Sequence, residues 1–416
     1  MKNILKNYKS TLILVVSVII GVVIGLLSPK TGIMLKPLGD VFINFLLVII
    51  IPLIFLTITT SICKMSNPKR LGKIMGTTLI VFVVTSLVSA LVGFISTYGI
   101  NLVNTEDSNL IMEGFNNGEV GTTDVSILER TADLITVGSF GELLTTDNLI
   151  ALLVFSVIFG IAINMSGEKG EAAKRVLNYF NDIVMNFIKI IMYYAPLGIG
   201  CYAAYLTSTF GASIAVGYLK VFIIYTVVAI LYYFVFYTIY AYIAGKKEGV
   251  KRFWKNVLPA TMTAITTCSS AASIPVNSMC AKKVGVSDDI ADTVIPLGTS
   301  FHKDGSIIGS VFKIMFLVCL FGTDISSLAG IGKVLLVALV ATLLVTAVPI
   351  GGGTVSEMMI LTMMGYGVGA LPILTIIATI IDPPATMLNV VGDLSSSMLV
   401  SRIVDGKNWM KKKIIR

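Results

Sequence analysis

The chain has 416 residues, of which 55% are hydrophobic and only 13% charged, and its mean hydropathy is +0.90. A soluble domain carries about 25% charged residues, so this composition excludes a soluble protein and indicates a polytopic membrane protein. The net charge of +8 does not indicate nucleic-acid binding, because the basic residues gather in short loops and at both ends. A single histidine and five cysteines without C-x-x-C spacing indicate no disulfide framework, zinc site or cofactor.

The first 250 residues predict six membrane helices with a long polar loop after the third. The expected segments are Thr11–Leu27, Val41–Cys63, Gly76–Leu102, Leu149–Asn164, a long fifth helix broken at Tyr193–Gly198, and Ile214–Ala244. Residues 104–148 hold nine acidic side chains against one arginine, whereas basic residues flank the second and sixth segments. The positive-inside rule therefore predicts a cytoplasmic N-terminus, an extracellular acidic loop and a cytoplasmic basic tail at 406–416 in the cell membrane.

The second half predicts two interrupted segments that alternate with two spanning helices. Residues 253–284 are broken by Thr266–Pro275, and residues 330–367 by Val348–Thr354, so that each flanking piece is too short to span a membrane. We expect two re-entrant hairpins entering from opposite sides, with spans at 290–321 and 371–404. The predicted fold is all-α, with eight transmembrane helices and two hairpins in an inverted repeat, which is typical of secondary transporters. A channel or a membrane enzyme is disfavoured, because the polar groups gather at mid-depth and no nucleophile–base pair stands out.

The last span carries a narrow polar stripe. Its members are Asp382, Thr386, Asn389 and Asp393, which fall within roughly 60° of a helix. Carboxylates inside a membrane cost roughly 2.5–3.5 kcal/mol each and usually face an interior site. The stripe therefore favours binding of a cation or an ammonium group over the alternative, a polar seam between helices.

The order of these motifs resembles that of the dicarboxylate/amino acid:cation symporter family, the glutamate transporter homologues. The resemblance lies in the Tyr-Ala-Pro-Leu-Gly stretch, the serine-rich first break, the Pro-Leu-Gly…Asp-Gly span, the Pro/Gly second break and the final Asp…Thr-Met-Leu-Asn-Val-Val-Gly-Asp helix. It implies a homotrimer that works as an elevator, with scaffold helices in residues 1–75 and 149–212. The implied transport domain holds residues 76–103, 213–250 and 251–405.

The resemblance also assigns roles to individual residues. Asp382 would hold a substrate ammonium group, Thr386 would lie beside the substrate side chain, and Pro349, Gly351 and Gly352 would form the outer gate. The substrate carboxylate would be bound by Asn389 and the backbone at Ser269 and Ser270. One Na+ would lie at Asp393, Gly298 and Asn389. A second would lie at Asp304, Thr85 and Ser86, with the His302 carbonyl as a further ligand.

Two departures from the family pattern bear on the substrate and the ion. Members that take acidic substrates carry an arginine where this chain has Ala385 or Cys268, so we expect a small neutral amino acid such as serine, threonine or alanine. An acidic amino acid or a C4-dicarboxylate is the alternative. The family's Asn-Met-Asp-Gly-Thr reads His302-Lys-Asp-Gly-Ser306 here. Lys303 either pairs with Asp304, replaces a bound Na+ or reaches the substrate, which leaves H+ coupling or an altered Na+ stoichiometry open.

Three further features have simple structural interpretations. The Pro383-Pro384 pair predicts a kink in the last helix. Glu357 is expected in water or in a polar seam, and the aromatic run Tyr232–Tyr237 as a packing face.

Overall fold

The computed structural model describes residues 2–63, 69–103, 136–145, 148–343 and 352–411, and this part of the chain is helical without a strand. In chain order the helices are α1 (Lys2–Leu27), α2 (Pro29–Met34), α3 (Lys36–Cys63), α4 (Lys69–Thr97), α7 (Phe140–Leu143), α8 (Leu149–Met165), α9 (Glu168–Phe210), α10 (Ala212–Asn256), α11 (Leu258–Thr267), α12 (Ser270–Val284), α13 (Asp288–Phe301), α14 (Asp304–Phe321), α15 (Leu328–Leu343), α16 (Gly352–Met364) and α17 (Leu371–Val404). Short 3-10 turns follow at Val368–Ala370 and Trp409–Lys411.

Several of these helices can cross a bilayer. By length and apolar composition, five segments of the described chain qualify, and a sixth does if the bent α9 counts as one span. The all-helical membrane architecture is therefore confirmed, whereas eight spans with two hairpins stay a prediction. Most of the predicted acidic loop, at 104–135 and 146–147, lies outside the described residues.

Helix α9 bends by 52° between Ile191 and Tyr193. Pro196 lies inside this helix. A proline removes a helical hydrogen bond and its ring clashes with the carbonyl four residues earlier, which here belongs to Met192, at the bend itself. The break expected near Tyr193–Gly198 is thus a kink within one helix.

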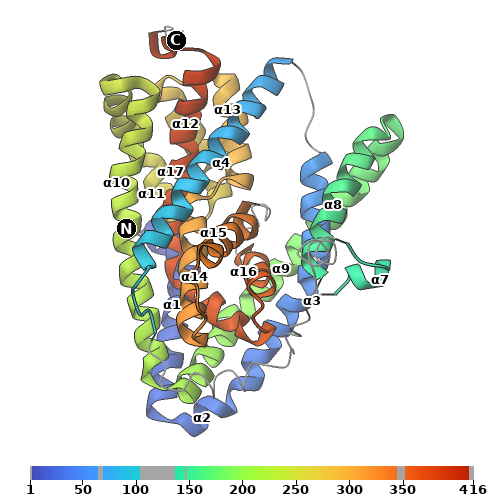
Figure 1. The fold of residues 1–416 in the computed structure, drawn as a ribbon, viewed down its shortest axis with the longest axis vertical. Coiled ribbons are helices and arrows are strands. Elements are labelled where there is room, and N and C mark those ends of the chain that lie inside the picture. The colour runs from blue at the N-terminus through green and yellow to red at the C-terminus, as the bar shows by residue number, and fades with distance from the viewer. Residues whose placement is uncertain (1, 64–68, 104–135, 146–147, 344–351, 412–416) are drawn as a thin grey trace.

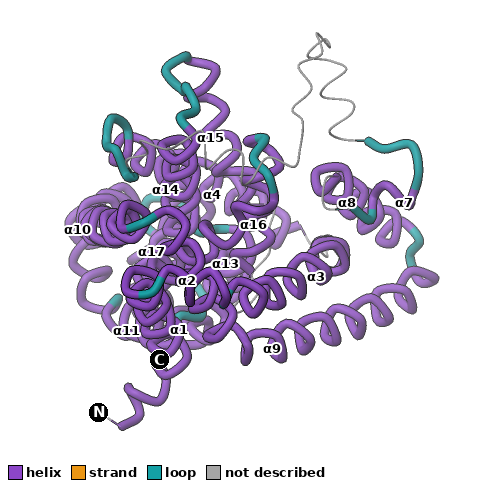
Figure 2. Tube along the Cα trace, turned by 90° about the horizontal axis from the view of Figure 1, so that it is seen from below, coloured by secondary structure: helices purple, strands orange, loops and turns teal. Residues whose placement is uncertain are grey.

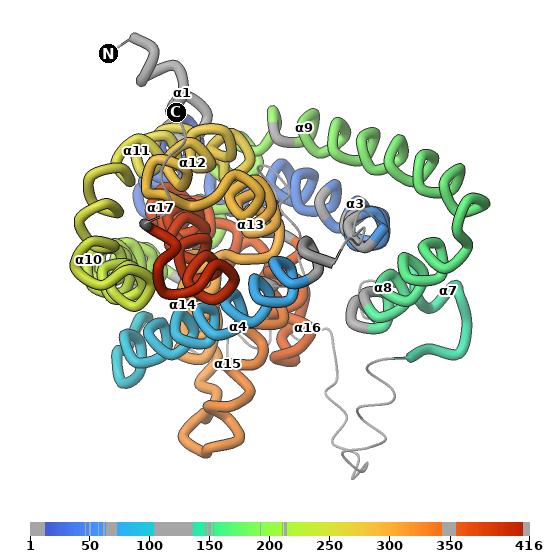
Figure 3. The backbone as a smooth tube through the Cα atoms, turned by 90° about the horizontal axis from the view of Figure 1, so that it is seen from above, coloured from blue at the N-terminus to red at the C-terminus, as the bar shows by residue number. Residues whose placement is uncertain are grey.

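The helices form two groups, which Figures 2 and 3 show from opposite sides. Helices α1, α2, α3 and α8 pack on α9. In the second group, α4, α10–α14 and α16 pack on α17, and α15 packs on α14, α16 and α4. Small residues allow α1 and α9 to approach closely. A Cβ placed on Gly21 would lie 2.1 Å from the carbonyl oxygen of Gly200, so a larger residue would not fit there. Such close approach is the usual way in which helices associate in a membrane.

Helix α17 is the centre of the second group (Figure 1). It contacts α4, α10, α11, α12, α13 and α14, and nearly every side chain from Ala385 to Ser401 is buried. It also continues unbroken through Pro383 and Pro384. The prolines therefore do not interrupt the helix that carries the polar stripe.

Two of the neighbouring segments are interrupted where they meet α17. The first break separates α11 from α12 at Cys268, whose φ of +46° lies in the left-handed region, and at Ser269, which caps α12. The second break separates α13 from α14 at His302, which is extended, and Lys303, which is also non-helical. The break expected at Val348–Thr354 lies mostly outside the described residues, and its last three residues belong to the start of α16. Irregular backbone at membrane depth is tolerated where it is buried in protein or lines a cavity.

Candidate functional site

The polar stripe of α17 makes hydrogen bonds within its own helix and to the first turn of α14. Near its start, Thr386 Oγ1 donates to Asp382 Oδ1 at 3.2 Å. One turn on, Asn389 Oδ1 accepts from the backbone N–H of Ser306 at 3.1 Å, and Asn389 Nδ2 donates to Ser306 Oγ at 3.0 Å. Asn389 thereby ties the stripe to the first turn of α14.

The imidazole of His302 lies between the two carboxylates that the sequence placed at cation sites. Its Nδ1 is 3.0 Å from Asp393 Oδ1, and its Nε2 is 3.2 Å from Asp304 Oδ1. The hydroxyl of Thr85, on α4, is 2.8 Å from the same Nε2. The ring of Phe82 stacks on the imidazole with the centroids 4.4 Å apart, and all of these side chains are buried. The ring of His302 therefore has a fixed place and polar partners on both sides.

Asp304 is also held by hydroxyl groups that the sequence did not single out. Ser89 Oγ donates to Asp304 Oδ1 at 2.7 Å and lies 2.8 Å from the hydroxyl of Tyr232. The hydroxyl of Tyr237 lies 3.2 Å from Asp304 Oδ2 and 2.6 Å from the carbonyl oxygen of Leu388. The interpretation of the α10 tyrosines as a packing face is thus incomplete, since the rings of Tyr232 and Tyr237 pack against each other while the Tyr237 hydroxyl reaches the carboxylate and the Tyr232 hydroxyl reaches Ser89.

Two glycines let the carboxylates approach the neighbouring backbone. A Cβ on Gly298, in α13, would lie 2.2 Å from Asp393 Oδ1. A Cβ on Gly392, in α17, would lie 2.7 Å from Asp304 Oδ2 and 3.1 Å from His302 Cε1. These positions require glycine because a buried carboxylate already fills the space.

Replacing Gly392 with Ala should reduce transport to a small fraction of the wild-type rate while leaving the protein folded. The added methyl group must displace Asp304 or His302, and overpacking of this kind costs typically about 1–3 kcal/mol. Uptake and the melting temperature of the purified variant would be compared with those of Gly332→Ala, which has open space around its Cβ. Normal uptake by Gly392→Ala would mean that the geometry around Asp304 is unimportant for transport.

A buried ion pair lies elsewhere in the same group of helices. Lys313 Nζ on α14 is 3.6 Å from Glu357 Oε1 on α16, and Thr375 Oγ1 on α17 donates to Glu357 Oε2 at 2.8 Å. Glu357 is 1% exposed, so of the two settings expected for it the polar seam is found and contact with water is not. The sequence analysis overlooked Lys313, although a lysine inside an apolar span is a strong signal by itself.

The remaining predicted site residues are placed as follows. Ser269 caps α12 and accepts from Ala272 N–H, and Ser270 begins that helix, but no described contact joins either residue to Asp382. Ser86 is buried, and its hydroxyl has no hydrogen-bond partner within the described part of the chain. Gly352 begins α16, whereas Pro349 and Gly351 lie outside the described residues. Their roles in a gate or in substrate binding stay predictions.

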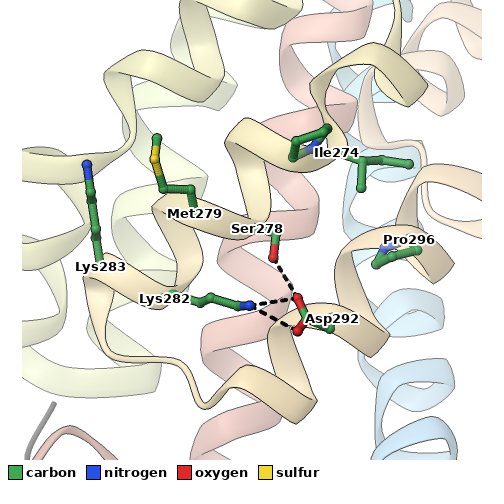
Figure 4. A pocket seen from close by; sticks show the side chains of 8 residues that line it. Ile274, Ser278, Met279, Lys282, Lys283, Asp292 and Pro296 are labelled. Carbon is green, nitrogen blue, oxygen red and sulfur yellow. Dashed lines mark hydrogen bonds and ion pairs between the residues drawn. The ribbon is translucent and has the colours of Figure 1, made fainter. Parts of the chain in front are cut away.

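A surface groove of about 720 Å³ lies between α12 and α13 (Figure 4). Lys282 Nζ and Ser278 Oγ both lie 2.9 Å from Asp292 across it. None of the predicted substrate or cation residues lines this groove, and an exposed ion pair of this kind contributes little to stability.

Comparison with known proteins identifies the family. The sodium:dicarboxylate symporter family matches residues 11–403 of the chain. The protein belongs to this family. The resemblance found in the sequence is thus confirmed, and the chain is a multi-pass membrane symporter of a transporter family and not of an enzyme class.

Individual relatives cover most of the chain at modest identity. A proton/sodium-glutamate symport protein of Bacillus caldotenax is 27% identical and covers 93% of this chain and 92% of its own length. A C4-dicarboxylate transport protein of Pseudomonas syringae pv. tomato is 27% identical over 94% of this chain and 85% of its own length. A C4-dicarboxylate transport protein of Bacillus subtilis is 29% identical over 77% of this chain and 76% of its own length.

Proposed function

We propose that this family member takes up a small neutral amino acid, such as serine, threonine or alanine, and is driven by an inward cation gradient. The observation that carries the proposal is the setting of Asp382. This carboxylate is partly buried in α17, and the described residues give it one hydrogen bond, from Thr386, and no basic partner. A carboxylate at membrane depth without a counter-charge suits a ligand that brings a positive group.

This setting distinguishes two classes of substrate. The ammonium group of an amino acid would supply the charge that Asp382 lacks. A C4-dicarboxylate has no ammonium group and would bring two further negative charges to the same helix. Electrostatics therefore favour the amino acid, as in the relative named a glutamate symport protein, over the substrate of the relatives named C4-dicarboxylate transport proteins.

The basic side chains nearby argue further for a neutral substrate. A second carboxylate on the substrate would need a positive partner, because an unpaired buried charge is costly. Lys313 is already paired with Glu357. Lys303 lies half-buried at the N-cap of α14, next to Asp304 in the chain. The positions at which the family resemblance expects an arginine hold the apolar Ala385 and the thiol of Cys268.

The two groups of helices fit the elevator mechanism that the family resemblance implies, and the homotrimer rests on that resemblance alone. The group that packs on α9 corresponds to the expected scaffold, and the group around α17 to the expected transport domain (Figures 2 and 3). Pro349–Gly353 would act as the outer gate of the transport domain, and both chain ends would lie in the cytoplasm.

A binding experiment with the purified protein tests the substrate class. Serine, alanine, threonine, aspartate and succinate would be compared by thermal stabilisation in the presence of NaCl at constant pH. We expect stabilisation by at least one neutral amino acid at concentrations at which aspartate and succinate have no effect. Stabilisation by aspartate or succinate alone would contradict the proposal.

Replacing Cys268 with Arg should shift the preference toward acidic substrates. Cys268 is half-buried at the break between α11 and α12, so a long side chain has room there, and a guanidinium binds a carboxylate in a bidentate manner. We expect the ratio of aspartate to serine affinity to rise at least tenfold, about 1.4 kcal/mol. The matched variant Cys319→Arg, in α14, should leave that ratio unchanged. An unchanged ratio in Cys268→Arg would argue that the substrate side chain lies elsewhere.

A further inference from the structure

We propose that the imidazole of His302 takes the place of a transported Na+ between Asp304 and Asp393, so that this symporter binds no sodium ion between those two carboxylates. The proposal deepens the proposed function, on which it rests only for the assumption that a cation gradient drives transport. It concerns which ion the protein can carry and not which substrate.

The position of the ring is the first argument. Nδ1 of His302 contacts Asp393 Oδ1 at 3.0 Å, and Nε2 contacts Asp304 Oδ1 at 3.2 Å. A hard cation binds carboxylate oxygens directly, at about 2.3–2.6 Å for Ca²⁺, which is similar in size to Na+. At the second predicted site, an ion bound to both Asp304 Oδ1 and the Thr85 hydroxyl would have to lie where Nε2 already contacts both oxygens. The ring and such an ion exclude one another.

The immobility of the ring is the second argument. His302 is 0% exposed, Phe82 stacks on one of its faces, and the Thr85 hydroxyl lies 2.8 Å from Nε2. Its backbone N–H also donates to the Gly298 carbonyl oxygen at 2.8 Å. The ring could leave only by breaking several buried hydrogen bonds and the aromatic contact together.

The use of the predicted sodium ligands is the third argument. Both cation sites expected from the family resemblance meet this one side chain, because Asp393 belongs to the first and Asp304 and Thr85 to the second. The Gly298 carbonyl accepts a helical hydrogen bond, and both polar atoms of the Asn389 side chain are bound to Ser306. Most of the oxygens that would surround a sodium ion are thus directed at His302 and at neighbouring protein groups, whereas Ser86 Oγ and Asp393 Oδ2 have no hydrogen-bond partner within the described chain.

The structure also separates the contributions of His302 and Lys303. Lys303 is half-buried at the N-cap of α14, whereas the ring of His302 is fully buried between the carboxylates. The residue that occupies the space between Asp304 and Asp393 is therefore the histidine. The family pattern has asparagine at this position, so a single substitution restores the pattern.

The test compares wild type with His302→Asn, His302→Ser and Lys303→Met. The purified proteins are heated without substrate over a range of NaCl concentrations, with choline chloride holding the ionic strength constant. Both His302 variants should gain a saturable, Na+-specific rise in melting temperature, and Lys303→Met should respond as wild type does. His302→Ser keeps the test valid if the asparagine variant fails to fold. Because no substrate is present, this result is independent of the proposed substrate.

Transport gives a second readout. The ratio of Na+ to substrate, obtained from reversal potentials in proteoliposomes, should rise by one or more in His302→Asn. An unchanged Na+ response in both His302 variants would overturn the proposal, as would a gain confined to Lys303→Met. If instead the wild type responds to Na+ and Asp393→Asn abolishes that response, sodium binds beside the histidine and the proposal fails.

Discussion

Replacing Asp382 with Asn should reduce substrate affinity at least 30-fold and bring uptake close to background. The substitution keeps the size of the side chain and its ability to accept from Thr386, but it removes the negative charge. Loss of one member of a buried, hydrogen-bonded charge pair costs about 2–5 kcal/mol, and about 2 kcal/mol corresponds to 30-fold. Binding would be measured by thermal stabilisation with serine, and transport by uptake of labelled serine.

The matched control for this substitution is Asp324→Asn. Asp324 is exposed in the turn between α14 and α15 and accepts from the backbone N–H of Ser326, so it has no place in the proposed site. The control should bind and transport as wild type does. If Asp382→Asn retains serine affinity within threefold, the carboxylate does not bind an ammonium group, and a substrate without one becomes the better candidate.

Breaking the ion pair between Lys313 and Glu357 should have the largest effect on stability. Removal of one partner leaves the other as an uncompensated charge inside the protein, which typically costs about 3–5 kcal/mol. We therefore expect Lys313→Met and Glu357→Leu each to lower the melting temperature strongly. Replacing a whole buried pair with apolar residues is often nearly neutral, so Lys313→Met combined with Glu357→Leu should recover most of the loss.

This prediction is checked by a double-mutant cycle on thermal unfolding in detergent. Residues in direct contact are non-additive, and the coupling energy isolates their interaction. Lys251→Met serves as the control, because Lys251 is exposed on α10 and should be replaceable with little change. Additive losses in the double variant would show that the two charges do not stabilise one another. The pair joins α14 to α16, and α16 begins next to the expected outer gate. Loss of the pair should therefore also loosen the packing of α16 against α14.

The sequence predicted the long elements of the fold well where hydrophobic patterning was strong. The last span was expected at Leu371–Val404, and α17 has these bounds. The break in residues 253–284 was expected from its serines and proline, and it lies at Cys268 and Ser269. Patterning did not reveal the interruption at His302 and Lys303, because a two-residue non-helical break leaves the apolar period on either side almost unchanged.

The partners within the site were harder to predict than its members. Periodicity showed that Asp382, Thr386, Asn389 and Asp393 share one face of a helix, but it carries no information on which side chains of other helices meet that face. The roles of Ser89, Tyr237 and Ser306 depend on packing among α4, α10 and α14, which are distant in sequence. Of His302 only the backbone carbonyl was expected at a cation site, since the bridging position of its ring depends on where Asp304 and Asp393 lie in space.

One measurement tests the central claim most directly. Purified protein in proteoliposomes would be given labelled serine with imposed inward Na+ and H+ gradients, and with ionophores that dissipate them. The account predicts transient accumulation of serine above the external concentration, lost when the cation gradients are dissipated. Two results would contradict the account. One is that serine only reaches its external concentration, with or without the gradients, and the other is that aspartate or succinate accumulates but serine does not.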